Sequence, residues 1–359
     1  MKIVQIVANL NIGDAIGNDV LAIDQALKSA GYNSEIMSIT IHEDLRSAAK
    51  ELDFRQIGPE DLVIFHKATG DPLAKRLEAL SCRKVVLYHN ITPWTFYRFY
   101  DPVQSLNLWR GRRQLKQLAK SADAGWADSV YNMRELAEAG FRPDSLSVLP
   151  ILFDPKSGEK ADSALLNRLR REKGTKLLFI GRVAPNKKQE DIIKVYHQYL
   201  QNEDPDAKLY LVGSWQGFEK YFAKLKGFAA DLKLTDDQVI FTGRVSEAEK
   251  QSYLQGADAL VCMSEHEGFC VPLLEAMAND LPVAAFAAAA VPETLGENGL
   301  LFHEKNYAAI AAGLGRLRRD EDFRRGILEY QRERLRQFDP AKTEEKLLTL
   351  IARVLEENV

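Results

Sequence analysis

Short apolar runs alternate along this chain with longer stretches in which apolar residues recur every three or four positions. The first pattern is typical of buried parallel strands, and the second of helices that cover a sheet. Six strands are expected in each half of the chain, over 2–7, 33–37, 62–65, 84–88, 125–127 and 147–149, then 176–180, 208–212, 239–242, 259–262, 283–286 and 299–302. The pattern therefore runs twice and predicts an α/β protein with two doubly wound, Rossmann-like domains.

A turn-rich segment over 150–158 separates the two halves. The chain has 359 residues, which is more than a single hydrophobic core usually supports. We therefore expect an N-terminal domain over 1–155 and a C-terminal domain over 156–340. A last helix is expected over 341–359, packed back on the N-terminal domain.

Composition excludes several classes of function. The 48 basic and 51 acidic side chains nearly balance, which argues against a nucleic-acid partner. The three cysteines have neither the number for a disulfide framework nor the spacing of a zinc site. The longest apolar candidate, 281–292, is too short to cross a membrane. A cytoplasmic protein is expected, and any membrane contact would be peripheral, on the inner face.

The segment 264–278 follows the strand that ends near Cys262. Pro272 suits the first turn of a helix, and the positive end of such a helix suits a diphosphate. Glu267 on the loop and Glu275 in the helix add acceptors for sugar and ribose hydroxyls. The alternative is that Glu267 only caps the helix and Glu275 is only solvated.

Two cations, Arg182 and Lys187, follow the strand 176–180. Both leave the strand at its carboxyl end, where open α/β sheets bind their ligands, so both can reach one anion. Cations placed there would stabilise the negative charge of a departing nucleoside diphosphate. The alternative is an exposed basic turn.

These two segments together are more specific than either alone. Glu267 and Glu275 form a Glu-x7-Glu pair, preceded by the Arg-x4-Lys pair of Arg182 and Lys187. Further matching segments are Gly13 with Gly17, 87–90, 127–129, 148–150, Gly181-Arg182, 241–243 and 291–293. The chain thereby resembles the family 4 retaining glycosyltransferases, which have the GT-B fold of two Rossmann-like domains facing across a cleft.

The resemblance implies four catalytic residues. Arg182 and Lys187 match the pair that binds the diphosphate, and Glu267 matches the acid that contacts the donor sugar. His89, after the fourth expected strand, matches a cleft histidine near that sugar. A satisfied core histidine is the alternative for His89.

The resemblance also implies four donor-binding residues. Glu275 matches the acid that holds the nucleotide ribose, and Gly268 and Phe269 match the loop backbone over the sugar and phosphates. Gly13 matches a first-loop glycine that permits close approach to donor and acceptor.

Three positions depart from glycines that are frequent in this family. Lys188 follows the lysine of the Arg-x4-Lys pair, Cys270 follows Phe269, and Asp280 ends an Asn-Asp dipeptide where a small residue and a glycine are usual. The first loop also has Asp14, Ala15 and Ile16 between its two glycines. None of these departures removes a charged group that the chemistry needs.

Two further segments have an open interpretation. Asp204-Pro205-Asp206 has the form of a metal-binding Asp-x-Asp string, but it precedes the strand 208–212, so a turn is the preferred interpretation. The stretch 94–120 holds six aromatic and six basic residues against one acid. It forms either a basic, aromatic surface for anionic lipid headgroups, or aromatics that line an acceptor pocket or the core beside a solvated basic helix face.

The sequence thus predicts a retaining, metal-independent glycosyltransferase of the hexosyltransferase type. It would move a sugar from a UDP- or GDP-sugar to a hydroxyl on a saccharide or lipid-linked acceptor, in bacterial surface polysaccharide or glycolipid biosynthesis. No cofactor and no metal are expected. The alternatives are another reaction on this fold, such as epimerisation or phosphorolysis, or a non-catalytic sugar-nucleotide binder or scaffold.

Overall fold

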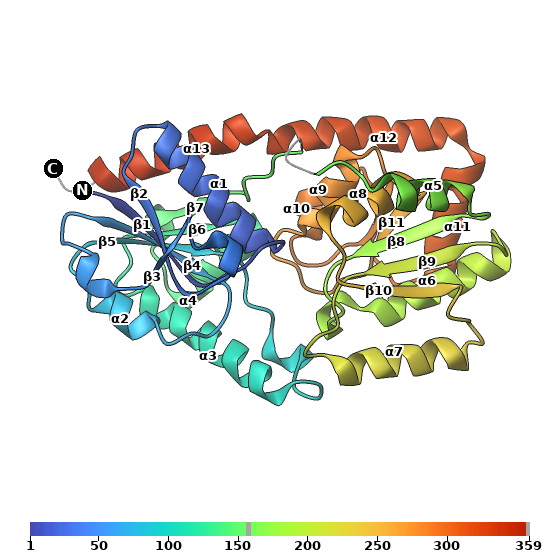
Figure 1. Ribbon diagram of the computed structural model, residues 1–359, viewed down its shortest axis with the longest axis horizontal. Helices are drawn as coiled ribbons and strands as arrows, with labels where there is room; N and C mark the ends of the chain where they lie inside the picture. The colour runs from blue at the N-terminus through green and yellow to red at the C-terminus, as the bar shows by residue number, and fades with distance from the viewer. Residues whose placement is uncertain (156–158, 357–359) are drawn as a thin grey trace. The chain divides into compact units, whose positions relative to one another are not determined.

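The computed structural model describes residues 1–155 and 159–356, which fold into two compact units (Figure 1). The first unit contains Met1–Thr95, Pro102–Phe153 and the chain from Phe338 onward. The second contains Phe96–Asp101 and Asp154–Gln337.

The first unit is built on a parallel sheet of seven strands in the order β3-β2-β1-β4-β5-β6-β7. The strands are β1 (Ile3–Leu10), β2 (Ser34–Ile41), β3 (Lys50–Glu51), β4 (Leu62–Lys67), β5 (Arg83–Tyr88), β6 (Ala124–Ala127) and β7 (Leu146–Val148). The helices are α1 (Ala15–Ser29), α2 (Ala74–Glu78), α3 (Pro102–Leu118), α4 (Val130–Ala139) and α13 (Pro340–Glu356).

The second unit is built on a parallel sheet of six strands in the order β10-β9-β8-β11-β12-β13. The strands are β8 (Lys176–Ile180), β9 (Lys208–Val212), β10 (Val239–Gly243), β11 (Ala259–Cys262), β12 (Val283–Phe286) and β13 (Leu300–Phe302). The helices are α5 (Ser163–Arg171), α6 (Gln189–Asn202), α7 (Glu219–Asp231), α8 (Glu247–Gly256), α9 (Val271–Ala278), α10 (Val291–Leu295), α11 (Tyr307–Arg319) and α12 (Glu321–Leu335).

The predicted α/β class with two doubly wound parallel sheets is confirmed, and all twelve expected strands are present. The sequence missed β3, an edge strand of two exposed residues. Its pairing with Met37 and Ser38 of β2 leaves no hydrophobic pattern in the sequence. Between the strands, amphipathic helices such as α1 bury one apolar face against the sheet.

The last helix, α13, completes the core of the first unit. Leu347, Ile351 and Val354 of this helix belong to one buried cluster with Trp126 of β6 and Leu62 of β4. Leu347 and Ile351 are fully buried. Burying such a face is the main source of stability for a helix on a sheet, so α13 is an integral part of this unit.

The segment Phe96–Asp101 packs on the second unit, which the expected domain boundaries did not anticipate. Tyr97 meets the ring of Phe218 edge-on at 4.7 Å between centroids. Tyr100 meets Tyr221 of α7 in the same way at 5.2 Å. Aromatic pairs of this kind stabilise the packing of the segment beyond what its buried apolar area contributes.

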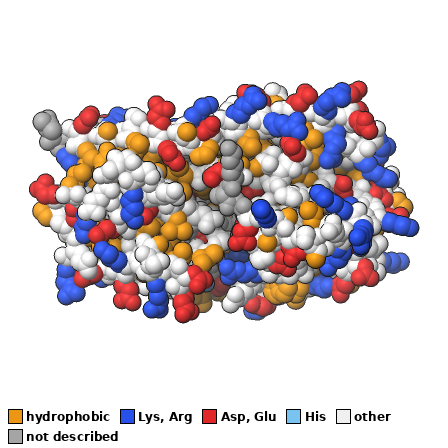
Figure 2. Space-filling model, turned by 45° about the horizontal axis from the view of Figure 1, so that its top comes forward, with side chains coloured by type: hydrophobic (Ala, Val, Ile, Leu, Met, Phe, Trp, Pro, Cys, Tyr) orange, Lys and Arg blue, Asp and Glu red, His pale blue; other side chains and the backbone are white. Residues whose placement is uncertain are grey.

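The surface carries mixed charge. On the face drawn in Figure 2, acidic and basic side chains are interspersed, in keeping with the net charge of -3. Among the helices of the described residues, none is both long enough and apolar enough to span a membrane.

Candidate functional site

The loops that follow β8 and β11 carry most of the predicted site. These two strands are parallel neighbours in the sheet, so their carboxyl ends lie at the same edge. The loop after β8 leads through Gly181 into a short 3-10 turn, Pro185–Lys187. The loop after β11 leads into α9. The topology alone therefore brings the two loops side by side.

Lys187 and Glu267 form an ion pair between these loops. The Lys187 Nζ lies 2.6 Å from both carboxylate oxygens of Glu267. The side chains are 23% and 8% exposed, so the pair is largely shielded from water. Burial alone would lower the pKa of Lys187, but the Glu267 carboxylate outweighs it and raises that pKa. The ammonium therefore stays charged, and one of its three N–H groups remains for another acceptor.

Asn186 ties the two loops together through two hydrogen bonds and makes a third to Tyr97. Its Nδ2 donates to the His266 carbonyl at 3.1 Å, and its backbone carbonyl accepts from the Glu265 N–H at 2.9 Å. Its Oδ1 accepts from the Tyr97 hydroxyl at 3.1 Å. Because Asn186 is buried, these bonds hold Lys187 and Glu267 in register.

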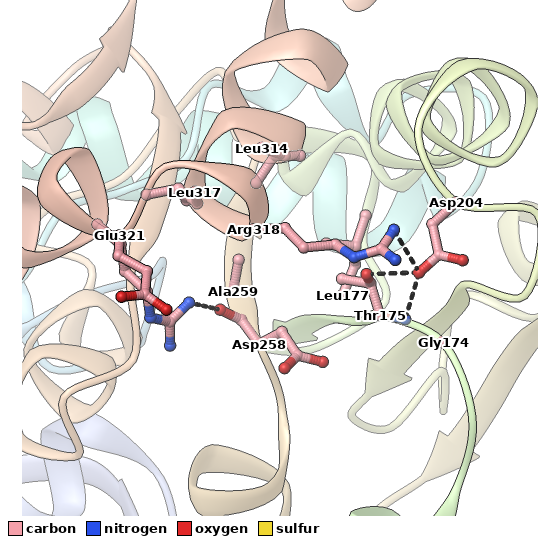
Figure 3. Close-up of a pocket in the computed structure, with 11 residues that line it drawn as sticks. Gly174, Thr175, Leu177, Asp204, Asp258, Ala259, Leu314, Leu317, Arg318 and Glu321 are labelled. Carbon is pink, nitrogen blue, oxygen red and sulfur yellow. Dashed lines mark hydrogen bonds and ion pairs between the residues drawn. The ribbon is translucent and has the colours of Figure 1, made fainter.

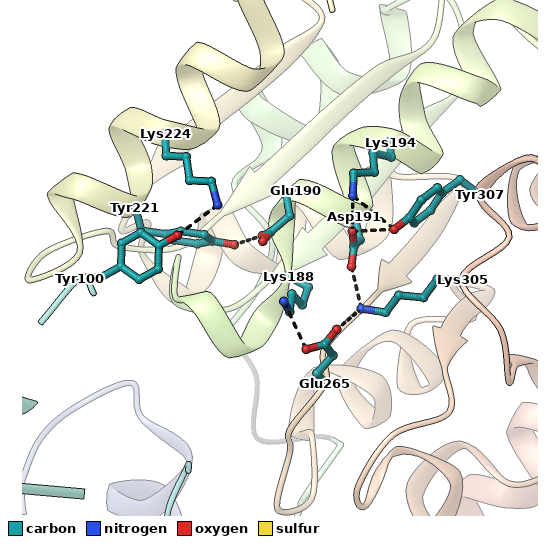
Figure 4. Close-up of polar contacts among 10 residues, drawn as sticks. All are labelled: Tyr100, Lys188, Glu190, Asp191, Lys194, Tyr221, Lys224, Glu265, Lys305 and Tyr307. Atoms are coloured by element: carbon teal, nitrogen blue, oxygen red, sulfur yellow. Dashed lines mark hydrogen bonds and ion pairs between the residues drawn. The ribbon is translucent and has the colours of Figure 1, made fainter. Parts of the chain in front are cut away.

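A second network of polar contacts holds Glu265 in the same loop (Figure 4). Lys305 Nζ lies 2.6 Å from both Glu265 and Asp191, and Lys188 Nζ lies 3.2 Å from Glu265. Asp191 also accepts from the Tyr307 hydroxyl at 2.8 Å. Chained ion pairs of this kind restrain Glu265, two residues before Glu267.

The three departures from glycine share one backbone conformation. Lys188, Cys270 and Asp280 have φ angles of 53°, 71° and 52°, all in the left-handed region. Glycine adopts that region freely, whereas other residues pay about 1 kcal/mol or more there. The loops thus keep the shape that glycine would give them, and Lys188 uses its side chain to bind Glu265.

Cys270 is the N-cap of α9, and Pro272 lies in the first turn of that helix. The loop before it is pinned at its backbone. The Glu267 carbonyl accepts from the Ala290 N–H at 3.2 Å, and the Phe269 carbonyl accepts from the Thr294 hydroxyl. The side chain of Phe269 is also buried. The loop is therefore fixed at the amino terminus of α9, where the helix dipole is positive.

Glu275 has a different partner from Glu267. Its Oε1 lies 2.7 Å from Nζ of Lys250, which is also 2.7 Å from Glu247. The Glu275 side chain is 16% exposed, so it is held rather than freely solvated. Lys250 was not expected at the site, and its signal in the sequence is its spacing of three residues from Glu247 on α8.

Arg182 lies apart from the acidic groups of the loop. Its guanidinium donates to the Gln216 carbonyl at 2.8 Å and lies 4.8 Å from the centroid of the Phe218 ring. The residue is exposed. The structure therefore brings Lys187 to Glu267, whereas the Arg182 side chain packs against the neighbouring loop after β9.

In the first unit, the two predicted residues are His89 and Gly13. Gly13 has a φ of 74°, which explains a glycine there. At Gly17 a Cβ atom would come within 2.3 Å of the Asn11 carbonyl oxygen. The Asp14 carboxylate caps α1 by accepting from the Gly17 N–H at 2.6 Å. The first loop is therefore tight against the start of α1.

His89 lies in a buried chain of hydrogen bonds. Gln5 Nε2 donates to the Val20 carbonyl, so Gln5 Oε1 accepts from His66 Nε2 at 2.9 Å. His66 Nδ1 then accepts from His89 Nε2 at 2.8 Å, and His89 Nδ1 faces Asp128 at 3.1 Å. His66 and His89 each have a settled orientation as a result.

The burial of this chain shifts its pKa values in opposite directions. Burial, reinforced by His89, lowers the pKa of His66 well below its ordinary value. Burial also opposes charge on His89, but the carboxylates of Asp128, Asp19 and Asp14 outweigh it and raise the pKa of His89. Burial raises the pKa of Asp128, against the effect of His89.

Both ring nitrogens of His89 have protein partners, and its side chain is 1% exposed. These are the contacts of a satisfied core histidine, the alternative that the sequence left open. A role near the donor sugar stays a prediction. His66, near the end of β4, is the partner that hydrogen-bonds His89 Nε2.

Within residues 1–155 and 159–356, two clusters offer groups that can bind metal ions. Asp19, His66 and His89 form one, and Cys262, Glu267 and Cys270 form the other. In both, groups that would bind the ion already hydrogen-bond one another or a cation.

Asp204 lines a cavity of about 400 Å³ at the amino ends of β8 and β11 (Figure 3). Its carboxylate accepts from the Thr175 N–H and hydroxyl.

Comparisons with known proteins agree with this fold. Residues 165–334 match the family model of glycosyl transferases group 1. An uncharacterized glycosyltransferase of Haemophilus influenzae is 30% identical over 342 residues, covering 85% of this chain and 87% of the relative. A trehalose synthase of Thermococcus litoralis is 25% identical over 278 residues, covering 72% of this chain but only 61% of the synthase.

Solved structures share the fold. The complex of HepE from Anabaena with UDP and glucose has a TM-score of 0.77 at 19% identity, covering 98% of this chain and all of the other. A sucrose-phosphate synthase from Thermosynechococcus elongatus has a TM-score of 0.75 at 17% identity, covering 99% of each chain. Two doubly wound parallel sheets of this kind define the GT-B class. The chain belongs to the glycosyltransferases of group 1.

The buried carboxyl of Asp19 should make stability depend on pH. Burial, partly offset by His89, raises its pKa from 3.8 to about 7. Between these values the folded chain keeps a proton that the unfolded chain releases, so this contribution to stability is complete below about pH 4 and declines as the pH rises to about 7. Asp19→Asn should therefore raise the thermal midpoint relative to the wild type at pH 8, with little difference at pH 4.

Asp24→Asn on the same helix is the matched control, because Asp24 binds Lys28 and Ser34 instead of the histidine chain. The thermal midpoint of Asp24→Asn, compared with that of the wild type, should not rise between pH 4 and pH 8. An Asp19→Asn midpoint that follows the wild type at every pH would show that Asp19 is ionised in the folded chain.

Proposed function

We propose that this chain is a retaining, metal-independent hexosyltransferase that uses a UDP- or GDP-sugar. The observation that carries the proposal is the ion pair of Lys187 and Glu267 beside the start of α9. It lies within the segment that matches the family model. A cation, a carboxylate and a helix amino terminus at one sheet edge suit a sugar diphosphate.

In this proposal, Lys187 stabilises the departing diphosphate. Its ammonium is charged and pre-positioned, so it needs no reorganisation when negative charge develops on the leaving group. Arg182, which is exposed on the same loop as Lys187, closes on the same phosphates from its position over Phe218. The backbone of Gly268 and Phe269 and the amino terminus of α9 supply further donors.

Glu267 and Glu275 have separate tasks in the proposal. Glu267, oriented by Lys187, accepts hydroxyl hydrogens of the donor sugar. Glu275, oriented by Lys250, accepts those of the nucleotide ribose. The acceptor hydroxyl attacks the anomeric carbon on the face that the diphosphate leaves. The leaving phosphate then takes the acceptor proton, so the transfer needs neither a protein nucleophile nor a metal ion.

The relatives support a hexose donor without fixing the acceptor. Trehalose synthase, a mannosyltransferase and a glucosyltransferase are among the curated matches. One match is an O-antigen chain mannosyltransferase of Escherichia coli, which supports a role in surface polysaccharide biosynthesis. The HepE complex with UDP and glucose supports UDP as the nucleotide. His89 and Gly13 would serve the sugar and acceptor.

We also propose a peripheral membrane contact through α3, within the 94–120 stretch, on the inner face of the membrane. Its exposed side includes Val103, Leu106 and Trp109, which are 73%, 45% and 40% exposed. Arg110 and Arg113 are exposed on the same helix, and the helix sequence contains no acidic residue. Apolar and basic side chains on one exposed face suit the headgroup region of an anionic bilayer.

Transfer should depend on Lys187 more than on any nearby cation. With EDTA present, the wild type should convert a UDP- or GDP-hexose and an acceptor to a glycoside that keeps the anomeric configuration of the donor, as read by NMR. Lys187→Ala should lower kcat about 100- to 1,000-fold, since a preorganised charge on the leaving group is lost. Glu275→Ala should mainly weaken nucleotide binding in calorimetry.

Lys220→Ala on exposed α7 is the matched control and should leave kcat unchanged. Incubation of the donor without acceptor separates the alternatives, because an epimerised sugar or a strict need for inorganic phosphate would replace transfer with another reaction. A protein that binds nucleotide and turns over none of these donors would be a binder instead.

Membrane contact should require the basic face of α3. The wild type should co-sediment with phosphatidylcholine vesicles that contain phosphatidylglycerol, and binding should weaken with added salt. Arg110→Glu with Arg113→Glu should abolish co-sedimentation, whereas the charge-matched pair Lys220→Glu with Lys346→Glu should not. Equal sedimentation of both double variants would remove α3 from the contact.

A further inference from the structure

Two cysteine side chains meet at the base of the loop that carries Glu267. Cys262 is the last residue of β11, and Cys270 is the N-cap of α9. Their Sγ atoms lie 4.0 Å apart, and the residues are 2% and 8% exposed. The two thiols therefore close the ends of a loop whose interior contains Glu267, Gly268 and Phe269.

Cys270 occupies a position that suits glycine better. Its φ of 71° lies in the left-handed region, where a residue with a Cβ atom is strained. Nothing in the shape of the loop requires a thiol there, because glycine would adopt this conformation freely. The Cys270 side chain occupies this strained position and contacts the Cys262 sulfur.

The contact between the thiols prepares one of them for reaction. The hydrogen bond from Cys270 lowers the pKa of Cys262, and the same bond together with burial raises the pKa of Cys270. Ser264 also lies close, with its Oγ 3.4 Å from the Cys262 sulfur. A thiolate on Cys262 with a protonated thiol beside it is the arrangement in which oxidation is followed by disulfide formation.

A metal ion fits the same cluster less well. Cys262, Cys270 and Glu267 could offer three ligands to a soft divalent cation. Both oxygens of Glu267, however, lie 2.6 Å from the Lys187 ammonium. A divalent cation would have to displace that charge, whereas a bond between the two sulfurs would leave the ion pair's charges balanced.

We propose that Cys262 and Cys270 form a reversible disulfide that switches off the site bearing Lys187 and Glu267. Peroxide is the oxidant. The Cys262 thiolate attacks one peroxide oxygen and becomes a sulfenic acid as hydroxide leaves. The Cys270 thiol then attacks the Cys262 sulfur, the S–O bond breaks, and water departs. Overall, two thiols and one hydrogen peroxide give one disulfide and two waters, and a dithiol reductant reverses the change.

The bond would move the site because the sulfurs must approach. A disulfide needs about 2 Å between sulfurs, so the pair must close from 4.0 Å. Since the Asn186 and Lys305 contacts hold Glu265 and His266, closing the sulfurs must pull the backbone from Glu267 to Cys270 against the hydrogen bonds that Ala290 and Thr294 make to it. The effect on transfer rests on the proposed function, but formation of the bond does not.

Treatment of the full chain with hydrogen peroxide tests the proposal. Peptide mass spectrometry should show a linked Cys262–Cys270 pair, and two of the three thiols should be lost in a titration under denaturing conditions. Turnover should fall about 100-fold, the loss expected when reacting groups are displaced by about 1 Å, and dithiothreitol should restore it. Nucleotide binding measured by thermal shift gives a second readout.

Cys270→Gly and Cys82→Ala are the matched variants. Cys270→Gly keeps the left-handed conformation, so it should retain turnover in reducing buffer and lose the response to peroxide. Cys82→Ala should respond as the wild type does, because Cys82 lies in the first unit.

Peroxide that leaves both thiols free, or oxidises Cys262 beyond the sulfenic acid without a linked pair, would overturn the proposal. A linked pair with unchanged turnover and nucleotide binding would overturn the switch. Absence of any transfer activity would count only against the proposed function.

Discussion

The contact between Lys187 and Glu267 is the constraint on which the site of the second unit depends. It joins the loops after two neighbouring parallel strands, and both side chains are largely shielded from water. A buried charge without a partner would be costly, so each member fixes the other. The loop on either side of this pair is held by contacts from Asn186, Lys305 and Thr294. The loop from Glu265 to Cys270 therefore keeps its charged groups in defined positions.

Much of this architecture can be predicted from the sequence. The twelve expected strands are visible because most of them bury a run of apolar residues, and the order of loops follows from parallel topology. The same topology predicts that Lys187 and Glu267 meet, since both follow strands that end at one edge. The left-handed positions could be anticipated where glycine is usual, and Lys188, Cys270 and Asp280 keep that conformation.

The remainder depends on tertiary contacts that leave no local pattern. The strand β3 has two residues and exists only through its pairing with β2. The attachment of Phe96–Asp101 to the second unit depends on ring contacts with Phe218 and Tyr221. Lys250 and His66 act through partners distant in sequence, so neither could be assigned its contact in advance. For Arg182 the local pattern was misleading instead. Its spacing from Lys187 suggested that both would bind one anion, but its side chain lies over Phe218.

A crystal structure of the chain with a bound nucleoside diphosphate tests the central claim most directly. The account predicts diphosphate oxygens within hydrogen-bonding distance of Lys187 Nζ and of the first backbone N–H groups of α9. It also predicts Glu267 still in contact with Lys187, and the ribose hydroxyls on Glu275. A nucleotide bound elsewhere, with the Lys187 and Glu267 pair untouched, would contradict it.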